Sequence, residues 1–237
     1  LYLASGGMLD KTPGSHNRRH HLTILVKNEK GYKNLVQLVT KAHLDGFYYK
    51  PRVDKDLLRR HHEGLICLSG CLQSEIAHLV NSNQPEKAEN AALEYRDIFG
   101  DGNFYIEIQP HFHKSENKNL YPNMIALARK LDLPLVATND AHYLLKEDEE
   151  YHDVLLAIGT GNKVSDANRL SVKGLDLSLK SPEEMAEIFK DIPEALLNTG
   201  KIADAVDFEF RFGNLQFPHF ELPEGMTAEE YLEKLAV

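Results

Sequence analysis

Residues 135–143 combine a short apolar run with one carboxylate and one imidazole. The apolar run favours a buried strand, and Asn139 and Asp140 form a turn pair, so we expect Asp140 and His142 to lie where that strand ends. Side chains two residues apart in an extended chain point the same way. An oxygen and a nitrogen ligand directed together from a strand's carboxyl end indicate a metal site. The alternative interpretation is a capping aspartate beside a surface histidine.

Two further side chains complete the candidate ligand set. Cys71 follows the predicted strand 65–68 through a Ser-Gly turn, and His21 precedes the predicted strand 22–26. His21 would reach the same end of the sheet only if its strand ran antiparallel to the others, as a hairpin between residues 1–4 and 22–26 would allow. Imidazole, thiolate and carboxylate ligands suit zinc or another borderline metal better than calcium. The alternative for Cys71 is a small buried residue in a tight turn.

The remaining histidines receive different interpretations. His111 and His113 follow the predicted strand 104–108 and could support the ligands or contact a substrate, with a polar loop as the alternative. The histidines in polar surroundings are interpreted as solvated surface residues: His16, His20, His61, His62 and His78.

Two basic stretches are candidates for nucleic-acid contact. Arg18 and Arg19 form the first, and in the second the aromatic residues 47–49 precede Lys50 and Arg52. Aromatic side chains beside cations are typical of single-strand binding. The second stretch is equally well interpreted as a packed loop.

Composition limits the classes of function. A net charge of −9 argues against sequence-independent phosphate binding by the whole surface, so a nucleic-acid substrate would need a local cationic patch or a bound metal. The two cysteines form no disulfide framework and fit a reducing compartment. No segment approaches the ~18 apolar residues of a membrane span, and no signal peptide is visible. These features predict a cytoplasmic protein that is not bound to a membrane.

Strand and helix patterns alternate over the first 160 residues. Strands are predicted at residues 22–26, 65–68 and 104–108 and at the run that begins at residue 135. Amphipathic helices are predicted over residues 29–42, 55–61, 73–80, 85–99, 117–131 and 147–158. This alternation indicates an α/β domain with a mostly parallel sheet or barrel, in which chemistry collects at the carboxyl ends of the strands.

The character of the sequence changes after about residue 160. A polar connection leads to a capping box at Ser181 and to a helix over residues 193–206. Residues 208–225 read as extended chain rich in Phe, and Thr227 caps a final helix. The chain starts without Met on a strand-like run and stops inside a helix, so we expect it to be a fragment of a longer protein.

Motifs along the whole chain resemble one family. They are HLTILVKNEKGYKNL from His21, GFYYKPR from Gly46, LSGC to Cys71, YRDIFG from Tyr95, ATNDAHY from Ala137 and LKSPEEM from Leu179. In this order they resemble the bacterial replicative DNA polymerase III alpha subunits, and specifically their N-terminal polymerase-and-histidinol-phosphatase (PHP) domain. The run PEGMTAEEYL from Pro223 resembles the family's passage toward the polymerase core.

The resemblance implies a distorted (β/α) barrel of the PHP type over residues 1–206, incomplete at its N-terminal side. Residues 207–237 would be a helical and extended connection toward the polymerase core. The family holds up to three divalent metal ions, and zinc or manganese is expected here. By position, His21, Cys71, Asp140 and His142 are the ligands present. The family's earlier ligands, a His-x-His followed by Asp, His and Glu, would precede this sequence, and Mg²⁺ would serve a polymerase site beyond it.

The implied function is that of part of a replicative DNA-directed DNA polymerase, a nucleotidyltransferase whose partners are DNA and other holoenzyme subunits. The PHP domain would be a metal-binding phosphoesterase-type module, with 3′–5′ exonuclease proofreading as its expected activity in the intact protein. The fragment lacks the polymerase site, so we expect it to be inactive alone. Two alternatives stay open: a catalytically inactive scaffold or docking module, suggested by the aromatic stretch 208–220, and a standalone PHP phosphoesterase.

Overall fold

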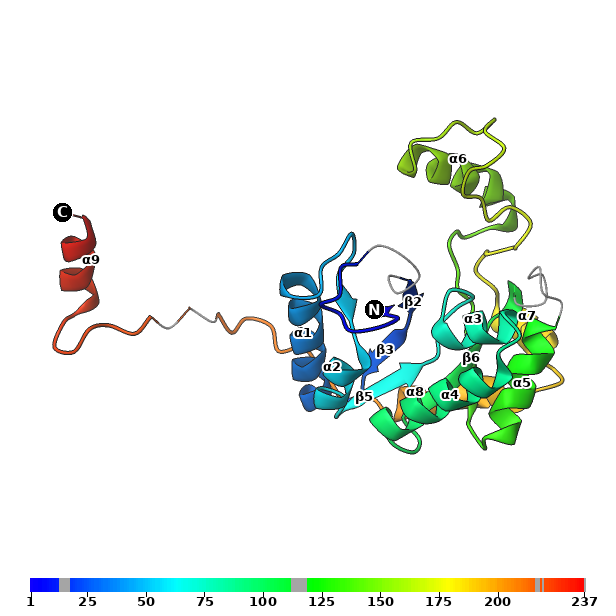
Figure 1. Cartoon of the computed structure of the whole chain (residues 1–237), viewed down its shortest axis with the longest axis horizontal. Coiled ribbons are helices and arrows are strands. Elements are labelled where there is room, and N and C mark those ends of the chain that lie inside the picture. The colour runs from blue at the N-terminus through cyan, green and yellow to red at the C-terminus, as the bar shows by residue number, and fades with distance from the viewer. Residues whose placement is uncertain (13–17, 112–118, 216–217, 219, 237) are drawn as a thin grey trace.

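A computed structural model describes residues 1–12, 18–111, 119–215, 218 and 220–236 of the chain. Two sheets and their helices form a body from which two segments project, one around α6 and one ending in α9 (Figure 1). The sequence expectations for His16 and His113 fall outside the described residues. No helix in the described ranges is long and apolar enough to cross a membrane.

The predicted strands and helices of the first 160 residues are present, and β2 and β4 are strands that the sequence did not predict. The strands are β1 (Tyr2–Ala4), β2 (Arg19–His21), β3 (Thr23–Val26), β4 (Arg52–Val53), β5 (Leu65–Leu68), β6 (Phe104–Ile108) and β7 (Leu135–Ala137). The helices are α1 (Glu29–Leu44), α2 (Lys55–Arg60), α3 (Glu75–Asn81), α4 (Pro85–Phe99), α5 (Leu120–Lys130), the 3-10 helix η3 (Lys146–Asp148), α6 (Glu149–Gly159), α7 (Pro182–Ile188), α8 (Pro193–Asp204) and α9 (Ala228–Ala236).

Side-chain caps set where several helices begin. Asn28 accepts a hydrogen bond from the Gly31 amide ahead of α1, and Asp54 accepts one from the Leu57 amide ahead of α2. Ser74 caps α3, which therefore begins at Glu75, two residues later than the sequence predicts. Such caps satisfy amide groups that the first turn of a helix leaves without partners.

The larger sheet has the strand order β3-β5-β6-β7. β5, β6 and β7 run parallel to one another, whereas β3 runs antiparallel to β5. The smaller sheet has the order β2-β1-β4. The α/β class is confirmed, but neither sheet of the described strands closes on itself, so a barrel is not seen.

The antiparallel run of β3 confirms the condition under which His21 reaches the carboxyl ends of the parallel strands. The expected hairpin is only partly formed, because β1 pairs antiparallel with β2, with Tyr2 opposite His21, and of residues 22–26 only Leu22 takes part. One backbone pair continues this contact, since Leu22 and Leu1 exchange hydrogen bonds through their main-chain groups.

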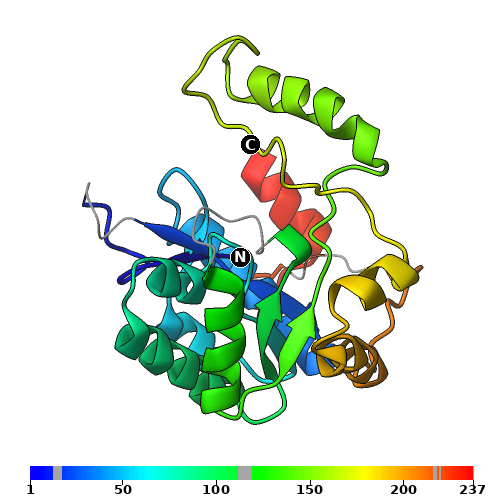
Figure 2. The ribbon, with the colours of Figure 1, turned by 90° about the vertical axis from the view of Figure 1, so that its right-hand side faces the viewer.

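Helices cover both faces of the larger sheet (Figure 2). Because alternate side chains of a strand point to opposite faces, Cys67 and Phe104 pack into the main core with α3, α4 and α5. Ile66 and Tyr105 pack on the other face with Ile202 of α8. Every residue of β5 and β6 is buried, which is typical of strands covered on both sides.

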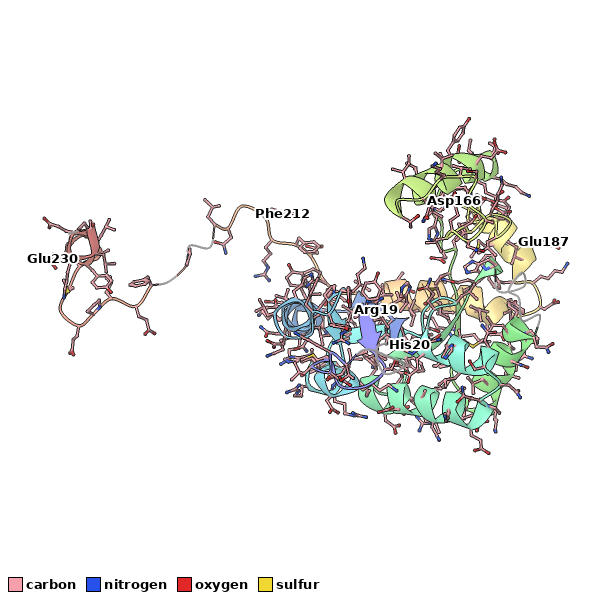
Figure 3. The ribbon with its side chains drawn as sticks, turned by 45° about the horizontal axis from the view of Figure 1, so that its top comes forward. Arg19, His20, Asp166, Glu187, Phe212 and Glu230 are labelled. Atoms are coloured by element: carbon pink, nitrogen blue, oxygen red, sulfur yellow. The ribbon has the colours of Figure 1, made fainter. Side chains whose placement is uncertain are left out.

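The segment around α6 is held together by a buried ion pair. The Arg169 Nη1 atom donates to Asp153 Oδ1 over 2.7 Å, and the Ser171 hydroxyl donates to the same oxygen over 2.7 Å. This pair joins α6 to the connection that follows it. Figure 3 shows Asp166 in this projecting segment, well away from Arg19 and His20 on the body.

The C-terminal stretch leaves the body along α1. The Asp207 amide donates to the Lys27 carbonyl over 2.7 Å, and the Phe208 ring stacks on Tyr32 of α1 with centroids 4.9 Å apart. Phe210 and Phe212 continue this aromatic contact outward. The helix α9 stands apart from the body (Figures 1 and 3).

A substitution at Gly31 tests how closely α1 packs against the turn at Gly64, which precedes β5. A Cβ at this position would lie 1.8 Å from the Gly64 carbonyl oxygen, so Gly31→Ala must displace backbone. We expect the substitution to lower the free energy of unfolding by about 2 kcal/mol, since overpacking outweighs the better helix propensity of Ala. Gly6→Ala is the control, because a Cβ there has no atom within 4 Å. Equal urea midpoints for the two variants would contradict the packing described.

Candidate metal centre

A cavity of ≈630 Å³ lies at the carboxyl ends of β5, β6 and β7. His21, Cys71 and Asp140, three of the four predicted ligands, line it. The other described lining residues are Leu1, Tyr2, Leu22, Thr23, Leu25, Leu68, Glu107, Gln109 and Thr138. The fold therefore brings together three predicted ligands that span 119 positions of the sequence, from His21 to Asp140.

His21 and Cys71 are in direct contact. The Cys71 Sγ atom lies 3.3 Å from His21 Nδ1, and the edge of the Tyr2 ring packs against the imidazole with centroids 5.2 Å apart. The His21 amide donates to the Gln73 carbonyl over 3.1 Å, which holds the end of β2 against the turn after β5. Burial lowers the pKa of His21 and raises the pKa of the Cys71 thiol, because it disfavours both charged forms.

We expected Asp140 and His142 to lie in one extended segment, but the structure differs. Asp140 has a φ of 57°, in the left-handed region, so the backbone turns between the two residues. His142 Nδ1 donates to the Asp140 carbonyl over 2.8 Å, which leaves Nε2 as the lone-pair nitrogen of the neutral ring. His142 is exposed, and its ring contacts His152 with centroids 5.5 Å apart. It lies outside the group of described residues that line the cavity.

His111 lies beside the Asp140 carboxylate. Its Nε2 atom is 3.8 Å from Asp140 Oδ2, and the imidazole is 3% exposed. Burial lowers the pKa of His111, and the negative charge of Asp140 partly opposes this effect. The interpretation of His111 as a residue that supports a ligand is therefore consistent with its position.

The sequence reasoning missed Glu107. This residue lies in the buried strand β6, and its carboxylate forms part of the cavity wall. Burial raises its pKa, and hydrogen bonds from neighbouring side chains and from the Gly70 amide oppose that rise. The available signal was a lone carboxylate inside an otherwise apolar five-residue strand, since a charged residue is almost never fully buried without partners.

The donor chemistry of the cavity suits a borderline metal ion, because it offers imidazole, thiol and carboxylate groups. Within the described part of the chain, however, no three His, Cys, Asp or Glu side chains stand close enough together to hold one ion. The cavity thus gathers possible donor groups, without a complete set for one ion among the described residues.

The first basic stretch is accessible. Arg18 and Arg19 are exposed, and the Arg18 guanidinium lies against the His78 ring, with Nη1 2.6 Å from Nδ1. Lys50 is also exposed. The interpretation of His20 as a solvated residue was wrong, because it is 5% exposed.

Arg52 corrects the prediction of nucleic-acid contact at its position. The side chain is 1% exposed, and Nη2 donates to the Met8 and Asp10 carbonyls over 2.8 Å each. Nε donates to the Gly46 carbonyl over 3.1 Å. The guanidinium therefore holds loops around β4 together, whereas Phe47, Tyr49 and Lys50 of the same stretch are exposed.

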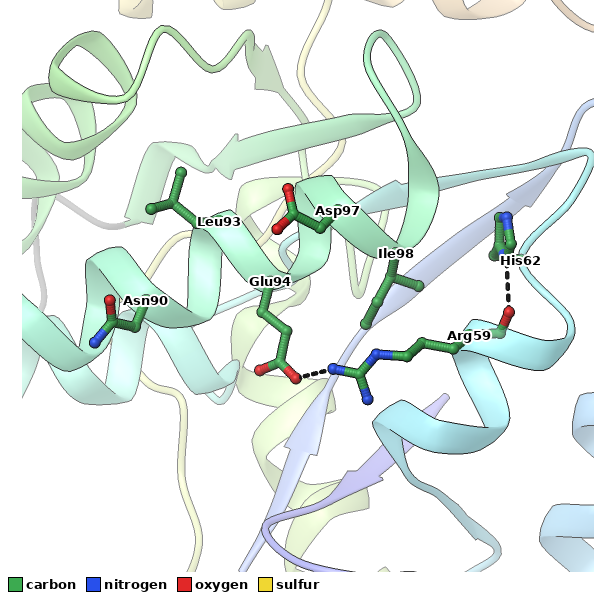
Figure 4. A pocket seen from close by; sticks show the side chains of 7 residues that line it. All are labelled: Arg59, His62, Asn90, Leu93, Glu94, Asp97 and Ile98. Atoms are coloured by element: carbon green, nitrogen blue, oxygen red, sulfur yellow. Dashed lines mark hydrogen bonds and ion pairs between the residues drawn. The ribbon is translucent and has the colours of Figure 1, made fainter.

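A second hollow, of ≈510 Å³, lies between α2 and α4 (Figure 4). Arg59 forms an ion pair with Glu94 across it, and the His62 ring donates to the Arg59 carbonyl over 2.7 Å. None of its described lining residues also lines the cavity that holds His21.

Comparison with known proteins matches residues 2–111 to the PHP domain. Along 98% of its length the chain is 42% identical to the DNA polymerase III subunit alpha of Treponema pallidum, of which it covers 20%. It is 43% identical to the corresponding subunit of Borreliella burgdorferi, with 92% of the chain and 19% of that subunit aligned. It is 40% identical to the DNA polymerase III subunit alpha of Thermus aquaticus, with 99% of the chain and 20% of that subunit aligned. The chain therefore spans about a fifth of the length of these relatives.

The loop that supports Asp140 and His142 is expected to loosen in acid. Asn139 accepts from the Lys180 amide over 2.7 Å, and the His142 amide donates to the Leu177 carbonyl over 2.8 Å. Although burial alone would raise it, hydrogen bonds from Lys180 and Ser178 lower the pKa of Asp176 from 3.8 to about 2.

The pKa of Asp176 is lower in the folded protein than in the unfolded protein. Its contribution to stability is therefore complete above the unfolded pKa and is lost as pH falls through the folded pKa. We expect hydrogen exchange of the His142 amide to accelerate as pH falls from about 4 to about 2, relative to the intrinsic rate. In Asp176→Asn this acceleration should be absent and protection already reduced at neutral pH. Identical pH profiles for both proteins would show that the ion pair does not hold this loop.

Proposed function

The chain is a PHP-domain homologue of the DNA polymerase III alpha subunits, and from this relationship we propose that its intact protein is a replicative DNA polymerase whose PHP domain hydrolyses phosphodiester bonds with bound divalent metal. The observation that carries the proposal is the single cavity lined by His21, Cys71 and Asp140. DNA and other holoenzyme subunits would be its partners, and the cytoplasm its compartment.

The proposed ligands are His21, Cys71, Asp140 and His142, with zinc or manganese as the metal. Bound metal would supply Lewis acidity toward a phosphodiester and lower the pKa of a coordinated water. His21 and His142 would bind as neutral imidazoles, and the hydrogen bond from His142 Nδ1 to the Asp140 carbonyl leaves Nε2 as the coordinating nitrogen. We further propose that residues outside this chain complete the shell.

A DNA substrate must approach a chain whose net charge is −9. Positive charge at the cavity would come from the metal, and Arg18, Arg19 and Lys50 are exposed cations that could contact phosphates nearby. The proposed substrate is a 3′ DNA end, removed in the 3′–5′ direction. Polymerisation would use a separate Mg²⁺ site in another part of the intact protein.

We propose the domain boundary at residue 206. Residues 1–206 would form the PHP domain, with a barrel arrangement completed in the intact protein. Residues 207–237 would connect it to the polymerase core, and the aromatic contacts of Phe208 and Phe210 with Tyr32 support their attachment to α1.

A docking module without catalysis is the second candidate. Exposed apolar side chains on two projecting segments favour it, among them Tyr151, Leu155 and Ile158 of α6 and Leu232 and Leu235 of α9. Such faces usually contact another protein surface.

The double substitution Asp140→Ala with His142→Ala in the intact protein tests the catalytic proposal. We expect lower metal content and a loss of metal-dependent 3′–5′ hydrolysis of at least about a hundredfold, because two ligands are removed. Metal content can be measured by mass spectrometry and hydrolysis on a labelled single strand. His62→Ala, in the hollow of Figure 4, should leave both unchanged. Undiminished hydrolysis in the double variant would reject the proposal.

The docking candidate predicts a different result. Leu232→Glu with Leu235→Glu should weaken association with other holoenzyme subunits by about tenfold or more while metal content stays normal. Glu233→Gln in the same helix is the matched control. Co-elution of all subunits at wild-type affinity, with both charged substitutions present, would exclude a docking role for α9.

A further inference from the structure

We infer that Glu107 is a positioning residue that holds together the four chain segments of the candidate metal centre. The inference rests on the proposed function, because it assigns a role in presenting the ligands of that site. It concerns a carboxylate that is 3% exposed and that no sequence motif singled out.

One carboxylate oxygen of Glu107 accepts hydrogen bonds from the segments that carry His21 and Cys71. Oε2 accepts from the Gly70 amide over 3.0 Å, and Gly70 directly precedes Cys71. The same oxygen accepts from the Thr23 hydroxyl over 3.3 Å, two residues after His21. These bonds fix the turn after β5 against the start of β3.

The other oxygen accepts hydrogen bonds from the segments that carry His111 and Asp140. Oε1 accepts from the Thr138 hydroxyl over 2.6 Å, two residues before Asp140. It also accepts from Gln109 Nε2 over 3.0 Å, two residues before His111. Each of the donors to Glu107 thus stands within two positions of a residue at the candidate centre.

Both oxygens already have two protein donors each, so the carboxylate is committed to the protein and is not itself a free metal ligand. The Glu107 backbone is held as well, because its amide donates to the Ser69 hydroxyl over 2.9 Å. A hydrogen-bonded carboxylate behind a ligand shell is the arrangement that orients ligands in metal sites.

Gly70 provides an independent indication that close approach is needed here. Its φ is +93°, and a Cβ would lie 2.6 Å from the His21 carbonyl oxygen. A residue without a side chain lets the Cys71 turn reach both His21 and the Glu107 carboxylate. The local backbone is therefore shaped around this carboxylate.

Two substitutions separate positioning from charge. Glu107→Ala removes the acceptor for all the donors and should release the segments of Cys71 and Asp140. Glu107→Gln should keep the network, because Gln109 can rotate its amide. The Oε1 atom of Gln109 has no hydrogen-bond partner among the described residues and is free to accept from the new amide.

The experiment uses the intact protein with Glu107→Ala, Glu107→Gln and Asn34→Ala. The Asn34 control also loses a buried hydrogen bond, from Nδ2 to the Glu63 carbonyl over 2.8 Å, away from the cavity. Zn²⁺ and Mn²⁺ affinities are measured by calorimetry. The rate at which iodoacetamide alkylates Cys71 in metal-free protein is measured by peptide mass spectrometry.

We expect Glu107→Ala to bind metal at least about tenfold more weakly, while Glu107→Gln and Asn34→Ala stay within about threefold of wild type. Alkylation of Cys71 should be several-fold faster in Glu107→Ala alone, because its turn is no longer held. Wild-type affinity and alkylation in a folded Glu107→Ala protein would overturn the inference.

Thr138→Val keeps the test decisive if Glu107→Ala does not fold. It removes the 2.6 Å bond from the Thr138 hydroxyl to Glu107 and the 3.2 Å bond that this hydroxyl accepts from Gln109 Nε2, while the Gly70 and Thr23 bonds to Glu107 stay. We expect metal affinity to fall by about threefold or more, and wild-type affinity is the contrary result. Asp140→Ala separates the two proposals. Metal binding that depends on Asp140 but not on Glu107 overturns the positioning role alone, whereas an intact wild-type protein that binds no metal overturns both proposals.

Discussion

Burial of one carboxylate in the larger sheet constrains the region around the cavity. A charged Glu107 in a strand covered on both faces is tolerable only where donors surround it, because an unpaired buried charge is strongly destabilising. Those donors come from the segments that follow β5, β6 and β7 and from the start of β3. The hydrogen bonds to this single carboxylate therefore hold the segments of His21, Cys71 and Asp140 around one cavity.

Much of the fold follows from local sequence signals. The helix at Pro85–Phe99 was predicted to its ends, because Pro at the first position and Gly100 after the last are strong local signals. Pairing between strands that are distant in the sequence was harder to predict. The partner of β1 is β2, with only Leu22 of residues 22–26 taking part, and such a register depends on contacts that no local pattern encodes. Barrel closure likewise depends on non-local pairing and is not seen among the described strands.

The site was predictable where strand ends identify positions, and less so where side-chain direction matters. His21, Cys71 and Asp140 share the cavity, as their places at strand ends suggested. The left-handed backbone at Asp140 was not expected, and with it the exposed position of His142. Glu107 was missed because an apolar strand pattern draws attention away from its one carboxylate, whose partners lie far along the chain.

The structure thus shows how a chain whose residues 2–111 match the PHP domain, and whose net charge is −9, presents imidazole, thiol and carboxylate groups at one cavity. Bound metal is the proposed local positive charge for DNA. The most direct measurement is anomalous diffraction from crystals of the intact protein grown with Mn²⁺ or Zn²⁺. Our account predicts an anomalous peak within coordination distance of His21, Cys71 or Asp140. A fully occupied ion elsewhere, with no peak in this cavity, would contradict it.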